Sequence, residues 1–212
     1  MQSLTTAARG AQIILEVAEE RFATAGFDGV SINEIARLAG VSKANIFHHF
    51  GSKEGLYLAV MRDAVARAAG MLAAEAPPDA GGPRAHLESF FGDHLQVLLQ
   101  APKATRLILR ELLESSSATA KALAEEVFAG YFSRLVGWVR SAQNAGELRQ
   151  GLDPSLFAFL LISANVHFFQ ALPVLQHLPE AGFAGDPGEY GRQVFALLMG
   201  GAAPPMEGHP DA

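Results

Sequence analysis

Residues 31–52 read SINEIARLAGVSKANIFHHFGS, and this stretch decides the fold. Ser31 and Glu34 match a capping box, in which a serine caps a helix and a glutamate three residues later reaches back to it. Gly40 then ends this short helix, and Ser42 is placed to cap another that runs to about His48. The pattern predicts two short helices joined by a tight turn.

A third helix precedes this pair. Apolar residues at helical spacing between Ile13 and Ala25 predict a helix that ends at Gly26. The two short helices are expected to be locked together by apolar residues at four positions, Ile35, Leu38, Val41 and Ile46. This is a helix-turn-helix arrangement, in which the last short helix is held outward so that its first turn can enter the major groove of DNA. Five residues of that helix are then expected on its outer face: Lys43, Ala44, Asn45, Phe47 and His48.

Only helical patterns follow, so the predicted fold class is all-α, with an N-terminal helix-turn-helix domain and a C-terminal helical bundle. Ser52 is expected to start a long helix to about residue 74, and 77–83 is a linker rich in proline and glycine. Later helices are expected over 84–99, 102–114, 118–144, 154–176 and 187–199. The predicted division is a helix-turn-helix domain over 1–50, a connecting helix over 51–76, the linker, a C-terminal domain over 84–200 and a disordered tail over 201–212.

Composition favours a soluble cytoplasmic protein. Half of the 212 residues are hydrophobic and 18% are charged, which allows a sizeable core. The absence of cysteine excludes disulfides, thiolate metal sites and a cysteine nucleophile. Residues 1–9 lack the pattern of a secretory signal, and polar residues with Pro173 interrupt the apolar run 156–174, which we interpret as a buried helix and not a membrane span.

The net charge of −6 is unevenly distributed. Residues 1–63 carry six Lys or Arg and seven Asp or Glu, whereas 64–212 carry ten and fifteen. The first part is therefore close to neutral, and contacts to DNA must come from a few placed cations and helix ends.

The segment from Phe27 to Leu56 resembles the signature of TetR/AcrR-family repressors, and the match extends over about residues 10–60. The resemblance implies a homodimer on a palindromic operator in double-stranded DNA. It also implies a ligand cavity in the C-terminal domain and release from DNA when a small molecule binds there.

The resemblance also implies roles for single residues. Ser31, Ser42 and Lys53 resemble phosphate contacts, although both serines would cap helices in any protein. The positions that resemble base-facing ones are Asn33, Lys43, Ala44 and Asn45. His48 could serve a phosphate or the groove, and with His49 it lacks the spacing of a metal site, so no metal is expected. The family usually has Tyr at the position of Phe47. Phe cannot donate a hydrogen bond to a phosphate, so this position departs from the family.

The helix expected over 154–176 is apolar on every side, which in so small a domain indicates burial against a partner chain. Together with the helix expected over 187–199, it is predicted to form a four-helix homodimer interface.

Ligand contacts are less defined. Ser163, His167 and Gln170 form a polar stripe that is expected at the dimer interface, in a ligand cavity or partly in solvent; Asn165, on the opposite side, has the same alternatives. Arg106, Arg110 and Glu111 are further candidates, and the two arginines could clamp an anionic group or form ion pairs, Arg110 with Glu114. Four further residues would be cavity walls or ordinary core: Met71, Phe128, Phe132 and Trp138.

Three functions remain open. The favoured one is a repressor that responds to a small, largely apolar ligand. The alternatives are a helical ligand carrier or enzyme that has only inherited the fold, and a regulator without a ligand. No metalloprotease motif, Gly-rich phosphate loop or cysteine is present, so we expect neither catalysis nor a cofactor.

Overall fold

The computed structural model describes residues 6–72, 81–114 and 117–202, and within these ranges it contains helices and no strand. The all-α prediction is therefore confirmed. The described residues fall into two compact units. The first unit comprises the described residues of 1–67 and 101–129. The second unit comprises the described residues of 68–100 and 130–212.

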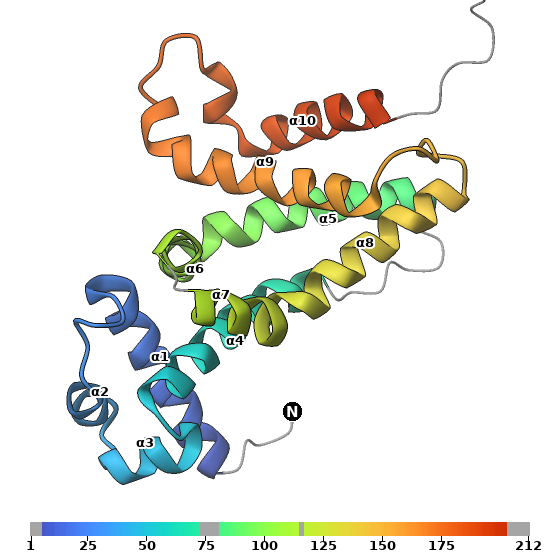
Figure 1. The fold of residues 1–212 in the computed structure, drawn as a ribbon. Helices are drawn as coiled ribbons and strands as arrows, with labels where there is room; N and C mark the ends of the chain where they lie inside the picture. The colour runs from blue at the N-terminus through green and yellow to red at the C-terminus, as the bar shows by residue number, and fades with distance from the viewer. Residues whose placement is uncertain (1–5, 73–80, 115–116, 203–212) are drawn as a thin grey trace, which may run out of the picture. The chain divides into compact units, whose positions relative to one another are not determined.

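The first unit begins with the predicted helix-turn-helix (Figure 1), formed by α1 (Thr6–Ala25), α2 (Ile32–Ala39) and α3 (Lys43–Phe50). Ser31 caps α2, because its hydroxyl oxygen accepts a hydrogen bond from the Glu34 backbone N–H at 3.1 Å. The second half of the predicted capping box differs, since the Glu34 carboxylate forms an ion pair with Arg21 of α1 at 2.6 Å. Gly40 adopts the left-handed conformation (φ 68°) that ends α2, so the predicted turn is confirmed.

A single apolar cluster holds these helices to the start of α4 (Lys53–Leu72). Ile35 of α2 and Ile46 of α3 are wholly buried in it, as predicted. Leu38 was expected to share this locking role, but 45% of it is exposed. Leu38 therefore adds little to the packing between α2 and α3.

The first unit also contains α6 (Pro102–Glu114), α7 (Ser117–Leu123) and a π-helical segment, η1 (Ala124–Phe128). Leu107 and Leu123 belong to the same buried cluster as Ile46. The division thus differs from the predicted boundary, which placed all of 84–200 in one domain. The single helix predicted over 118–144 is also interrupted, because η1 separates α7 from α8 (Ala129–Asn144).

The second unit consists of α5 (Gly82–Gln100), most of α8, α9 (Pro154–Leu175), the 3₁₀ turn η2 (Gly182–Gly185) and α10 (Pro187–Ala202). Helices α5, α9 and α10 lie side by side (Figure 1) and share a core that includes Phe91, Leu161 and Met199. Asp153 caps α9 as predicted, accepting hydrogen bonds from the backbone N–H groups of Ser155 and Leu156. Helix α5 starts at Gly82, inside the predicted linker; linker residues 77–80 and the tail from 203 on lie outside the described residues.

Helix α9 is long and apolar enough to cross a membrane by length and composition, and it is the one such helix among the described residues. Only 28% of its most apolar 18-residue window is buried within the chain. The prediction of a helix buried on every side is thus not met by one chain alone. The exposed side includes Leu156, Phe159 and Leu160.

Candidate nucleic-acid interface

Helix α3 is anchored on one side and open on the other. The wholly buried Ile46 packs into the core of the first unit, and α3 contacts both α1 and α2. The N-terminal residues of the helix, Lys43, Ala44 and Asn45, are exposed. The helix is therefore held rigidly from within while its first turn faces solvent, as a helix that reads base edges requires.

The outer face of α3 also carries aromatic and imidazole side chains. Phe47 is 39% exposed, and the Lys43 ammonium lies 5.6 Å from the centre of its ring. His48 and His49 are exposed as well. No acidic residue occurs in α3, so no side chain of this helix would repel a phosphate backbone.

Three predicted phosphate contacts lie at helix N-termini. Ser42 caps α3 by accepting a hydrogen bond from the Asn45 backbone N–H at 3.1 Å, and Ser31 caps α2 in the same way. Both serines are exposed, and a serine that accepts a hydrogen bond still has its own O–H to donate. Lys53, at the start of α4, lies with its ammonium 4.4 Å from the centre of the Phe27 ring. Asn33 is exposed on the first turn of α2.

The candidate ligand residues do not fall into one unit. Arg106, Arg110 and Phe128 belong to the first unit, where Arg110 pairs with Glu114 at 3.1 Å, as the ion-pair alternative predicts. Arg106 is exposed. The members in the second unit are Phe132, Trp138, Ser163, Asn165 and His167. The side chain of Met71 lies outside the described residues.

Within the second unit, Asn165 is the wholly buried member of the candidate set. Its Nδ2 donates to the Phe91 carbonyl oxygen at 2.7 Å and lies 3.3 Å from Nδ1 of His94. Among the described residues, neither its Oδ1 nor the buried hydroxyl of Tyr131 has a hydrogen-bond partner. His167 is exposed, Ser163 is half-buried, and Phe132 and Trp138 pack against the core.

Burial lowers the pKa of His94 to about 4, so this imidazole is neutral near pH 7. The Phe90 ring stacks on it, and Tyr131 lies beside it with ring centres 6.4 Å apart. The polar centre of the second unit is therefore uncharged and lined by aromatic rings. Asn165 was named as a candidate from the sequence, whereas His94 and Tyr131 were not, because the three residues lie on helices from distant parts of the chain.

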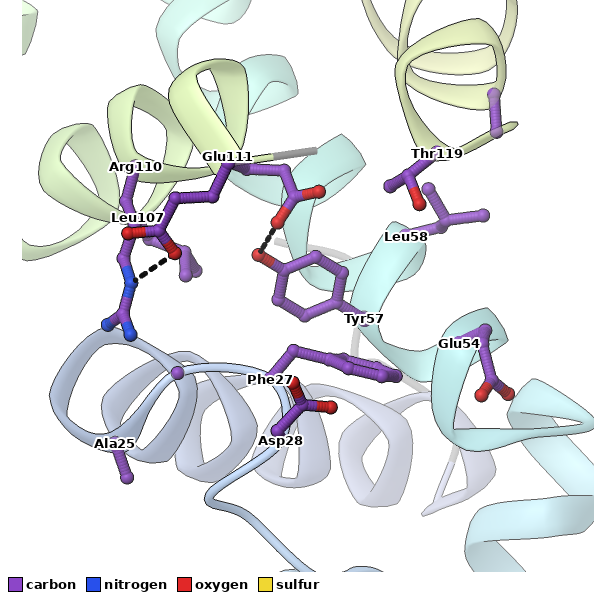
Figure 2. Close-up of a pocket in the computed structure, with 13 residues that line it drawn as sticks. Ala25, Phe27, Asp28, Glu54, Tyr57, Leu58, Leu107, Arg110, Glu111 and Thr119 are labelled. Atoms are coloured by element: carbon purple, nitrogen blue, oxygen red, sulfur yellow. Dashed lines mark hydrogen bonds and ion pairs between the residues drawn. The ribbon is translucent and has the colours of Figure 1, made fainter. Parts of the chain in front are cut away.

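The first unit also holds a polar link that was not predicted, although Glu111 was a candidate ligand residue. The Tyr57 hydroxyl of α4 donates to a Glu111 carboxylate oxygen of α6 at 2.6 Å, across 54 positions of sequence (Figure 2). Burial, and then the Glu111 carboxylate, raise the pKa of Tyr57 above its ordinary range. No local sequence signal connects the two residues. No group of three or more potential metal ligands occurs among the described residues.

The fold and the exposed first turn of α3 define a helix-turn-helix DNA-binding regulator of transcription. Residues 14–60 match the sequence profile described as "Bacterial regulatory proteins, tetR family". The chain is 31% identical over 170 residues to the HTH-type transcriptional regulator RutR of Escherichia coli, covering 77% of this chain and 75% of RutR. It belongs to the TetR family, and it is a regulator and not an enzyme.

Other similarities agree with this assignment. Over 58 residues, 27% of this chain and 31% of the relative, it is 45% identical to the HTH-type transcriptional repressor AcnR of Corynebacterium glutamicum. The fold is similar to that of the fatty acid degradation regulator FadR from Bacillus halodurans, with a TM-score of 0.76, 20% identity and coverage of 90% of this chain and 98% of that one. At that identity the second similarity concerns the fold alone.

Proposed function

We propose that this protein is a ligand-responsive repressor that binds a palindromic operator as a homodimer and leaves it when a small, largely apolar molecule binds in the second unit. The observation that carries the proposal is the placement of α3, whose Ile46 is wholly buried while Lys43, Ala44 and Asn45 are exposed. Two copies of α3 would enter major grooves about 34–36 Å apart, one helical turn of DNA.

The case for a homodimer rests on α9 and α10. The exposed apolar side of α9 includes Phe159 and Leu160, and Leu197 is exposed on α10. Several large apolar side chains exposed on two packed helices indicate an interface. A second copy of the chain would cover these side chains and form the four-helix interface expected from the sequence. We place the protein in the cytoplasm, where such a dimer meets DNA.

The effector site that we propose lies around Asn165. Buried polar atoms are nearly always hydrogen-bonded, and Asn165 Oδ1 and the Tyr131 hydroxyl have no protein partner among the described residues. A neutral ligand with an apolar body and one or two hydrogen-bonding groups would satisfy both. Such a ligand can release the repressor only if it binds the released arrangement more tightly than the DNA-bound one.

The dimer is tested by placing a charge on α9. We expect Leu160→Glu to yield monomers in light scattering and to lose operator binding, because a carboxylate cannot be buried unpaired in an apolar interface. Leu113→Glu is the matched control, since Leu113 is an exposed leucine of the first unit. A Leu160→Glu protein that remains dimeric would contradict the proposed interface.

The effector site is tested by the fluorescence of Trp138, the single tryptophan of the chain. Trp138 packs beside Phe90, with ring centres 5.7 Å apart, so a ligand near Asn165 should change its emission. Neutral apolar compounds that shift this emission should also lower operator affinity in a fluorescence-anisotropy titration. Compounds that shift emission and leave operator affinity unchanged would contradict release by this site.

A further inference from the structure

A cavity of about 620 Å³ lies within the first unit, apart from the effector site proposed above (Figure 2). Its walls come from the end of α1 with the turn that follows it, and from α4, α6 and α7. This volume lies in the range of pockets that hold small molecules, roughly 300–1,000 Å³. The cavity is therefore large enough for an organic ligand.

The charge of the lining selects the sign of that ligand. Four acidic residues line the cavity, Asp28, Glu54, Glu111 and Glu114, and among the described residues that line it Arg110 is the one cation. Arg110 is paired with Glu114, and Lys53, which does not line the cavity, lies near Glu54, so the lining still carries more negative than positive charge. Hydrogen bonds from its own backbone N–H and from Ser52 lower the pKa of Glu54, so that carboxyl is ionised at neutral pH. An anion would be repelled here.

The floor of the cavity is aromatic. Phe27 and Tyr57 meet edge to face with ring centres 5.1 Å apart, and Figure 2 shows Asp28 beside the Phe27 ring and Glu111 above Tyr57. The Phe27 ring already has one cation near it, the Lys53 ammonium at 4.4 Å from its centre. Aromatic faces attract organic cations, and more strongly where water is excluded.

The Tyr57–Glu111 hydrogen bond directs the carboxylate into this site. Tyr57 is almost wholly buried and donates to one oxygen of Glu111, which fixes the carboxylate over the aromatic floor. Among the described residues its other oxygen has no hydrogen-bond partner, so that oxygen can face an ammonium or phosphonium centre. Fixed negative charge next to aromatic rings is the combination that recognises an organic cation.

From these contacts we propose that the first unit binds an organic cation with an apolar or aromatic body, in the cavity between α4, α6 and the turn at 26–28. The site does not depend on DNA binding or on an effector in the second unit. It adjoins segments predicted to contact DNA, because Lys53 precedes Glu54 and the chain from Asp28 continues to Ser31.

Equilibrium dialysis of the full chain with tetraphenylphosphonium tests the proposal in the absence of DNA. Tetraphenylborate has the same shape and the opposite charge, so it measures apolar binding alone. We expect the wild-type protein to bind the cation, and Glu111→Gln to weaken that binding about fivefold to tenfold, because one charge near the ligand is lost. The same variant should not weaken binding of the anion.

Two further variants complete the design. Glu54→Gln removes a charge from an exposed residue that carries no packing, so it should fold normally and also weaken cation binding. Glu125→Gln is the matched control, because Glu125 is an exposed carboxylate of the same unit outside the cavity. Wild-type protein that does not bind the cation, or Glu111→Gln and Glu54→Gln proteins that bind it as the wild type does, would overturn the proposal. Because no DNA is present, neither result bears on operator binding.

Discussion

Two neighbouring residues of α3 should separate folding from DNA binding. Ile46 is wholly buried in the core of the first unit, whereas Phe47 is 39% exposed on the outer face. Ile46→Ala removes buried methyl and methylene groups from a packed site, which typically costs 2–5 kcal/mol, and we expect about 3 kcal/mol. Phe47→Ala removes an exposed ring and should cost less than about 1 kcal/mol.

Calorimetric melting of both variants measures these costs, and a loss of about 3 kcal/mol corresponds to a fall in Tm of roughly 6–12 °C for a chain of this size. Hydrogen exchange of the peptide that covers α3 locates the effect. The amides of 43–50 should exchange faster than in the wild type in Ile46→Ala, and at the wild-type rate in Phe47→Ala. DNA affinity should fall in both variants. In Phe47→Ala it should fall although the stability changes little. Equal stability costs for the two substitutions would refute the orientation of α3.

Other predictions follow from single contacts. Tyr57→Phe deletes the hydroxyl that donates to Glu111, and we expect urea denaturation to show a loss of about 1–2 kcal/mol, whereas a neutral result would mean that the contact is not formed in solution. Burial lowers the pKa of His94 from 6.5 to about 4. At a pH between these two values, His94 is therefore protonated in the unfolded chain and neutral in the folded one. The free energy of unfolding should therefore decrease by about 3 kcal/mol as the pH falls through that window. Urea denaturation monitored by Trp138 fluorescence measures this decrease. His94→Gln should remove that part of the pH dependence, and an unchanged dependence in this variant would count against the burial of His94.

Local signals made the helix ends in both units predictable from sequence. Ser31, Gly40 and Ser42 in the first unit and Asp153 in the second each act through their own backbone neighbourhood, and all four were placed correctly. The exposure of Leu38 was not predicted, because helical spacing alone does not tell how far a partner helix extends over a residue.

Contacts over long sequence distances were out of reach. The Tyr57–Glu111 and Asn165–Phe91 hydrogen bonds join residues 54 and 74 positions apart, and each depends on how whole helices pack. The π-helical segment η1 was not predicted either, because its sequence pattern is that of an ordinary helix. The boundary between the two units falls just after this segment. The exposure of Lys43, Ala44 and Asn45 was predictable because they lie within one turn of the Ser42 cap, and their contact with DNA stays a prediction.

We propose that the first turn of α3 reads base edges while nearby helix ends hold phosphates. Lys43 and Lys53 offer a matched pair, one on the exposed turn of α3 and one at the start of α4. Removing a base contact costs specific binding about 1–3 kcal/mol, whereas removing a phosphate contact weakens binding to all sequences alike and reduces the salt slope by about one.

The most direct measurement is fluorescence anisotropy of Lys43→Ala and Lys53→Ala, each titrated with the operator selected by the wild-type protein and with a scrambled duplex. We predict that Lys43→Ala loses about tenfold on the operator and little on the scrambled duplex, while Lys53→Ala loses similar amounts on both. A Lys43→Ala protein that is dimeric, folded and still prefers the operator as strongly as the wild type does would show that the first turn of α3 does not read base edges.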